Sequence, residues 1–169
     1  MYADWYKRIS GPFRNSPNSV VILNCLDKGL VAVIATGYIA MLIRLLSLLV
    51  TTGDTRFVKA LLVPAISFAV ATIIRKAINA PRPYEAFDID PLIKKSTRGE
   101  SFPSRHLFSA AIIACTLFWI NEACGVVAFI ACGVVGFCRI VGGVHFPRDI
   151  IGAIAFSIAF ALIGFVLIP

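Results

Sequence analysis

Five apolar stretches constrain the fold of this chain more than any other feature of its sequence. A membrane-spanning helix needs about 20 mostly apolar residues, and the chain is 59% hydrophobic, above the roughly 45–50% that is usual for soluble domains. The stretches cover about residues 29–50, for which an earlier start is the alternative, and then 57–78, 104–120, 124–141 and 147–168. The sequence therefore predicts an all-α, integral-membrane helical bundle of about five transmembrane helices, folded as one domain over residues 1–169 with a core at about 57–168.

Residues 1–19 precede these stretches and have a different character. Lys7, Arg8 and Arg14 are mixed with aromatic side chains such as Trp5, and glycine and proline interrupt the segment. Basic and aromatic residues together are typical of segments that lie in the membrane interface. We predict an interfacial segment here, with a mobile, solvated terminus as the alternative. No apolar h-region is evident, so no cleavable signal peptide is expected.

The charge of the chain indicates which partners to expect. Its formal net charge is +7 at pH 7, and the basic residues gather near the ends of the apolar stretches and in the segments beside them. A basic membrane surface favours an anionic lipid headgroup or a phosphate. Nucleic acid is not an expected partner, because no soluble basic domain is present to hold it. The five cysteines form no CxxC pair, so neither a disulfide framework nor a zinc site is predicted.

Two short clusters contain the two histidines of the chain, each next to arginine and at the edge of an apolar stretch. One cluster is the Pro-Ser-Arg-His run at 103–106, and the other lies within 139–149. Because consecutive spans end on alternate sides of a membrane, the loops 79–103 and 140–147 share one face. Arginines bind phosphate through paired, charge-assisted hydrogen bonds, and histidine titrates near neutral pH. We therefore predict a phosphate site at this face.

The first half of the predicted site comes from two arginines and one helix start. Arg75 and Arg82 are nearly two helical turns apart, so both can converge on one anion. Ser104 and His106 lie in the first turn of the third stretch, where free N–H groups attract an anion and a histidine can protonate a leaving oxygen. Alternatively, the arginines anchor a helix end in headgroups, Ser104 only caps the helix, and His106 is interfacial.

The second half comes from the cluster that ends at Asp149. A helix is expected to begin at Pro147, which places Asp149 in its first turn and His145 just before it. Asp149 can then accept a hydrogen bond from one ring nitrogen of His145 and leave the other nitrogen free as a nucleophile. Alternatively, Asp149 only offsets the helix dipole. Arg139 lies inside an apolar run, where a charge is costly unless it faces a polar cavity or a partner.

Three motifs, in this order, resemble the signature of type 2 phosphatidic acid phosphatases (the PAP2 family), integral-membrane lipid phosphatases that share an active-site design with vanadium haloperoxidases. The motifs are Arg75-x6-Arg82-Pro83, Pro103-Ser104-Arg105-His106 and Cys138-Arg139-x5-His145-x3-Asp149. The resemblance implies that His145 attacks phosphorus to form a phosphohistidine, that Asp149 orients it, and that His106 is the general acid and later activates water. It also implies a reaction without metal or other cofactor, and a phosphate-binding set of Arg75, Arg82, Ser104, Arg105 and Arg139.

This sequence departs from the family pattern at three positions. Arg75 stands where the family usually has lysine, Arg105 replaces a glycine, and Cys138 replaces a serine. The Arg105 side chain must point away from the site or add a phosphate contact, while Cys138 lacks the hydroxyl donor of serine. We interpret these departures as tuning of the site.

The resemblance implies a phosphorylated membrane lipid as substrate, of the polyprenyl diphosphate or phosphatidylglycerol phosphate type, with lipid A or phosphatidic acid as alternatives. The small size is similar to that of bacterial members, so a multi-pass protein of the cell (inner) membrane is expected. Envelope members of the family act on the outer face, which implies an extracytoplasmic site, although the positive-inside rule favours the cytoplasmic face. A non-catalytic transporter of anionic lipid and a lipid-binding scaffold are competing functions. The charged loop 84–101 either shapes headgroup choice or is merely solvated.

Overall fold

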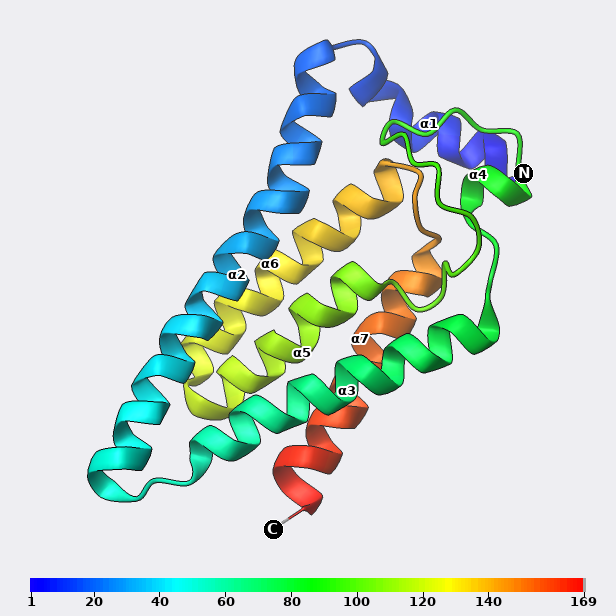
Figure 1. The fold of residues 1–169 in the computed structure, drawn as a ribbon. Helices are drawn as coiled ribbons and strands as arrows, with labels where there is room; N and C mark the ends of the chain where they lie inside the picture. The colour runs from blue at the N-terminus through cyan, green and yellow to red at the C-terminus, as the bar shows by residue number, and fades with distance from the viewer. Residues whose placement is uncertain (169) are drawn as a thin grey trace.

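The computed structural model describes residues 1–168 and is helical throughout its main elements, with no strand in that part of the chain (Figure 1). The elements are α1 (Tyr2–Arg14), α2 (Pro17–Thr52), α3 (Arg56–Ile78), α4 (Pro83–Ala86), α5 (Arg105–Ile120), α6 (Glu122–Val141), α7 (Pro147–Ala161) and a terminal π-helical segment, η1 (Leu162–Leu167). This architecture confirms the predicted all-α class.

Four of these segments are long and apolar enough to cross a membrane, namely Asn18–Thr52, Arg56–Ala86, Glu122–Val141 and Pro147–Leu167. The fifth apolar helix, α5, has 16 residues and is about 24 Å long, short of the roughly 30 Å of a hydrocarbon core. It lies in the middle of the bundle (Figure 1), in contact with α2, α3, α6 and α7. Leu107, Phe108 and Ala111 of α5 are fully buried there.

The first spanning helix begins at Pro17, which agrees with the earlier start that the sequence left open for the span at about 29–50. Proline is favoured at the first position of a helix because the amide hydrogen that it lacks would have no partner there. Asp27 and the neighbouring Lys28 give this segment its polar appearance in the sequence. In the structure Asp27 is buried and pairs with Arg139, so the helix carries the carboxylate without exposing it to lipid.

The loops that carry the two histidine clusters lie at the same end of the bundle, as the alternation of spans predicted. The C-terminal end of α3, the N-terminal end of α5 and the loop between α6 and α7 all meet there (Figure 1). The long connection from α4 to α5 passes over this end, next to α1. The turn between α2 and α3 lies at the opposite end. We refer to the face shared by loops 79–103 and 140–147 as the polar face of the molecule.

Helix α1 holds the loops of this face in place through Tyr6. The Tyr6 side chain is fully buried; its hydroxyl donates to the Val141 carbonyl at 3.1 Å and accepts from the Leu92 amide at 3.2 Å. Arg14, at the end of α1, forms an ion pair with Asp90 of the α4–α5 connection. The N-terminal segment is thus a helix docked on the site's loops, and its position in the membrane interface stays a prediction.

Helices α5 and α6 lie in close contact at Gly125. A Cβ atom on Gly125 would overlap the backbone and Cβ of Phe118 on α5. Asn121 fixes the tight turn between the two helices, because its side-chain oxygen accepts a hydrogen bond from the Cys124 amide at 3.0 Å. The absence of a side chain at residue 125 is therefore what allows α6 to lie against the central helix.

Alanine at Gly125 should destabilise the fold by about 1–3 kcal/mol, the usual cost of overpacking a well-packed contact. Gly133 provides the matched control, because it is an exposed glycine of the same helix, and a Cβ atom added there would meet nothing within 4 Å. Gly133→Ala should be neutral or slightly stabilising, since alanine is the better helix former. Thermal unfolding in detergent measures both variants, and equal stability of the two would contradict the close approach of α5 and α6.

Candidate active site

A cavity of about 460 Å³ opens at the polar face and collects side chains from four parts of the chain. Two of its lining residues lie within α3, one at the helix end and one seven residues deeper in the span. The others come from the start of α5, the end of α6 and the loops. The cavity is lined by Phe68, Arg75, Arg82, Lys95, Thr97, Arg98, Glu100, Arg105, His106, Ser109, Arg139 and His145. The two histidine clusters and the arginine pair therefore meet in one space.

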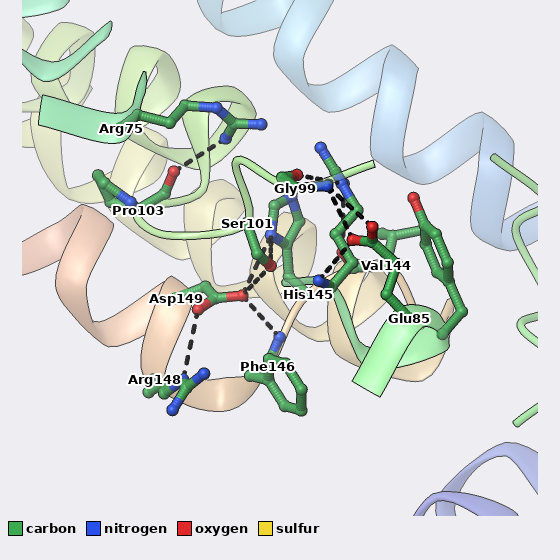
Figure 2. Close-up of polar contacts among 12 residues, drawn as sticks. Arg75, Glu85, Gly99, Ser101, Pro103, Val144, His145, Phe146, Arg148 and Asp149 are labelled. Atoms are coloured by element: carbon green, nitrogen blue, oxygen red, sulfur yellow. Dashed lines mark hydrogen bonds and ion pairs between the residues drawn. The ribbon is translucent and has the colours of Figure 1, made fainter. Parts of the chain in front are cut away.

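His145 and Asp149 are arranged as the sequence predicted, around a helix that begins at Pro147. The Asp149 carboxylate accepts the Phe146 amide at 2.9 Å and lies 3.4 Å from Nδ1 of His145 (Figure 2). Both side chains are buried, with Asp149 at 0% exposure. A proton on Nδ1 shared with Asp149 leaves the lone pair of Nε2 free for the cavity that His145 lines.

Ser101 completes this pair, and sequence reasoning missed it. Its hydroxyl donates to Oδ2 of Asp149 at 2.6 Å and lies 3.4 Å from Nδ1 of His145. Ser101 is fully buried, and its amide donates to the carbonyl of Ala80 at 2.8 Å. A single serine in a polar loop carries no sequence signal of its own, so only the three-dimensional contact identifies it.

Arg75 is held at the cavity by the loop that leads into α5. Its Nη1 donates to the Pro103 carbonyl at 3.0 Å, and its Nε lies 3.4 Å from the Glu100 carboxylate. The guanidinium is 6% exposed. These two partners occupy one side of the Arg75 guanidinium, and its remaining N–H groups are available to an anion in the cavity.

Arg82 is fixed by backbone groups rather than by an acid. Its Nε donates to the Gly99 carbonyl at 3.1 Å, and its Nη1 to the Val144 carbonyl at 3.4 Å. Glu85 accepts the amides of both Arg82 and Gly99, so one carboxylate ties the start of α4 to the loop (Figure 2). The bond to Val144 places Arg82 beside His145.

Arg139 and His106 share a partner that the sequence did not suggest. Arg139 is 4% exposed and its Nε lies 2.7 Å from Oδ1 of Asp27, on α2. Nε2 of His106 lies 3.4 Å from the Asp27 carbonyl and 3.7 Å from Oδ1. The two partners are 112 and 79 residues from Asp27 in the chain, so no local pattern indicates the contact. Arg139 thus satisfies both expectations for a buried charge, a partner and a polar cavity.

Ser104 is the predicted phosphate-binding residue that does not line the cavity described above. It is fully buried at the N-cap of α5, and its amide donates to the Asp149 carbonyl at 3.1 Å. Within residues 1–168 its hydroxyl has no hydrogen-bond partner, nor is it among the residues lining the cavity. A buried hydroxyl without a partner is costly. Its role as a phosphate ligand stays a prediction.

The cavity is strongly electropositive. Six of its lining side chains are basic, against a single acid, Glu100. The loop residues Lys95 and Arg98 are among the basic ones, so the connection from α4 to α5 contributes directly to the site. Partial desolvation, together with Arg139 and Arg82, lowers the pKa of Lys95 to about 8. In the part of the chain that the structure describes, no three His, Cys, Asp or Glu side chains gather as metal ligands. The arrangement is suited to hold a phosphate group beside two histidines.

His145 should remain neutral over the whole physiological range. Burial lowers the pKa of His145 to about 4, and the Arg82 charge acts in the same direction, although the Asp149 carboxylate opposes it. Because the pKa is lowered, the His145 ring takes up a proton only in acid. Protonation of this group should therefore reduce kcat/KM with a midpoint near pH 4, rather than near the usual value of 6.5. Nuclear magnetic resonance of labelled histidine in detergent measures this directly, because the chain has only two histidines. A His145 midpoint above about 6 would contradict the burial of the ring.

Comparisons with known proteins identify the family and the fold of this chain. The model of the PAP2 superfamily matches residues 56–169. A lipid A 1-phosphatase of Rhizobium johnstonii is 34% identical over 102 residues, which cover 56% of this chain and 40% of that protein. Undecaprenyl-diphosphatase BcrC of Bacillus subtilis is 31% identical over 117 residues, 67% of this chain and 58% of that protein. The chain thus spans about half the length of these relatives.

Two solved structures share the fold over nearly the whole chain. The crystal structure of Aquifex aeolicus LpxE superposes with a TM-score of 0.70 at 21% identity, covering 96% of this chain and 93% of that one. A PAP2-type phosphatidylglycerolphosphate phosphatase from Bacillus subtilis gives a TM-score of 0.67 at 20% identity, covering 97% of this chain and 84% of that one. At these identities the likeness concerns the fold alone.

Proposed function

This chain belongs to the PAP2 superfamily, and on that premise we propose that it is a metal-independent lipid phosphatase that forms a phosphohistidine on His145. The observation that carries the proposal is the contact of His145 with Asp149 at the edge of a cavity lined by arginines. A transporter or a scaffold for anionic lipid would also use the arginines, but it has no need of an oriented, neutral imidazole. The multi-pass helical fold, with the cavity at one end of the bundle, supports a site at one surface of a membrane.

The proposed reaction has two steps. In the first, Nε2 of His145 attacks phosphorus, the bond from phosphorus to the leaving oxygen breaks, and His106 gives that oxygen a proton. In the second, His106 takes a proton from water as the water oxygen attacks the phosphohistidine, which releases phosphate and restores His145. Charge on the transferring group is stabilised by Arg75, Arg82 and Arg139. Asp149 holds the His145 ring in the required tautomer.

The proposed substrate is a phosphorylated membrane lipid, of the polyprenyl diphosphate or phosphatidylglycerol phosphate type. The cavity supports this, because Phe68 of α3 and Ser109 of α5 line it and both belong to apolar helices. Its surplus of basic side chains suits a group with more charge than a single phosphate monoester. Lipid A and phosphatidic acid are alternatives with the same chemistry, and the names of the relatives include a lipid A phosphatase and an undecaprenyl-diphosphatase.

The proposed location is the inner membrane, with the site on the extracytoplasmic face. A cysteine introduced at the exposed Asp88 of the α4–α5 connection tests the sidedness, in a background where Cys25 and Cys124 are replaced by serine. A membrane-impermeant maleimide should label Asp88→Cys in intact cells. Labelling only after the cells are broken would place the site on the cytoplasmic face instead.

Phosphate release from a panel of purified lipid phosphates and diphosphates tests the proposed activity. We expect release from at least one lipid, unaffected by an excess of chelator. A labelled substrate, quenched in alkali, should leave its phosphate on the protein in an acid-labile form, as expected for phosphohistidine. Release from none of the lipids would refute the enzyme in favour of a transporter or a scaffold. Activity that is lost with chelator and restored by a divalent cation would refute metal independence alone.

A further inference from the structure

Asp27 is a buried carboxylate that the proposed reaction does not use. It lies on α2, outside the residues 56–169 that match the family model. Its side chain is 3% exposed, and a carboxylate at this depth in an apolar helix is costly unless it has partners. Both of its partners, Arg139 and His106, line the cavity, whereas Asp27 itself does not.

The two contacts of Asp27 differ in kind. The first is a close ion pair, 2.7 Å from Oδ1 to Nε of Arg139, which compensates the carboxylate charge. The second joins Asp27 to Nε2 of His106, at 3.4 Å to the carbonyl oxygen and 3.7 Å to Oδ1. The carbonyl oxygen and Oδ1 of Asp27 therefore both face Nε2 of His106. Both oxygens accept hydrogen bonds, so neither can donate a proton to this nitrogen.

We propose that Asp27 is a positioning residue for His106, holding Nε2–H so that Nδ1 is the nitrogen that exchanges a proton with the substrate. The proposal rests on the proposed function, because it assigns a partner to the general acid of that reaction. A carboxylate beside the ring also stabilises the imidazolium that must give up its proton to the leaving oxygen. Helix α2 thereby contributes to catalysis through a residue that never touches the lipid.

The variant Asp27→Asn tests this role, because it keeps the shape of the side chain and removes its charge. For a lipid phosphate monoester, whose leaving alkoxide needs a proton, the single-turnover rate of phosphoenzyme formation should fall by about ten- to a hundredfold, a part of the 10²–10⁴ typical of a general acid. The KM should stay the same or fall, since a negative charge beside the anion site is removed. For p-nitrophenyl phosphate, whose leaving group needs no proton, the rate of phosphoenzyme formation should fall by no more than about threefold.

A double-mutant cycle separates positioning from a general loss of structure. In a His106→Ala background, Asp27→Asn should reduce kcat by no more than about twofold, since its partner is already gone. Lys28→Gln is the matched control, an exposed neighbour on the same helix, and should behave as the parent. If Asp27→Asn does not fold, Asp27→Glu keeps the ion pair with Arg139 and should still reduce hydrolysis of the alkyl ester more than that of the aryl ester.

Several results would overturn the proposal. An equal loss in the rate of phosphoenzyme formation on both substrates would assign the effect of Asp27 to Arg139 or to the fold, and parent-like activity of Asp27→Asn would leave its carboxylate no role. Additive losses in the double variant would show that Asp27 does not act through His106. The parent and His145→Ala are measured alongside. If the parent releases no phosphate, the proposed function fails and this inference with it. If only the Asp27 variants behave unexpectedly, this inference alone fails.

Discussion

Alanine in place of His145 should abolish phosphate release, with a loss of at least about 10⁴-fold in kcat for every lipid that the parent hydrolyses. The reason is chemical, because His106 is the only other histidine of the chain, and its proposed role is proton transfer. His106 is turned toward Asp27. Single-turnover phosphate release in detergent measures the effect, and the labelled phosphoenzyme should be missing from the same variant.

Chemical rescue distinguishes a lost nucleophile from a disturbed fold. The His145 side chain lines the cavity, so its removal leaves a space that is open to a small molecule. Added imidazole should restore a measurable part of the phosphate release of His145→Ala, with a linear dependence on its concentration at low concentration. The same addition should have no effect on the parent. Undiminished activity of His145→Ala without imidazole would refute the phosphohistidine mechanism.

Asparagine in place of Asp149 should reduce kcat by about 10²–10⁴-fold, the scale typical of the orienting acid of catalytic triads. The carboxylate receives three groups in one place, the Ser101 hydroxyl, the Phe146 amide and Nδ1 of His145. An amide nitrogen turned toward His145 would favour the tautomer with its proton on Nε2, and that nitrogen could no longer attack. Histidine resonances in labelled protein report the tautomer independently of the rate.

Ser101→Ala serves as the graded control for this prediction. It removes one hydrogen bond to Asp149 and leaves the carboxylate in place, so the loss in kcat should be about tenfold or less. The substrate KM should change little in both variants, because neither residue lines the cavity. A large increase in KM with little change in kcat would mean that Asp149 and Ser101 bind the substrate instead of orienting the His145 ring.

The helices and the shared polar face could be predicted because their signals are local. Proline, glycine and charge end each apolar stretch, and the alternation of spans then brings loops 79–103 and 140–147 together. The start of α7 at Pro147 was predictable in the same way, and with it the contact of His145 with Asp149.

Contacts between distant segments could not be predicted from local patterns. The pairing of Asp27 with Arg139, 112 residues away in the chain, is such a contact, and no local pattern around either residue indicates it. Ser101 and Lys95 belong to an irregular connection whose path is fixed by hydrogen bonds to α1, α4 and the α6–α7 loop. No periodicity describes such a path, so the residues that it brings to the cavity become visible only in the folded chain.

Because α5 lies in the centre of the bundle, the position of the residues at its first turn should not depend on the thickness of the bilayer. Membranes of different thickness force the helices in contact with lipid to tilt or bend, and α2, α3, α6 and α7, which all carry exposed apolar side chains, are expected to respond. Helix α5 is surrounded by its neighbours and spans less than a full hydrocarbon core, so its ends need not follow the lipid headgroups. The position of His106, the proposed proton donor at the first turn of α5, is thus expected to depend on the helices packed around it rather than on the thickness of the bilayer.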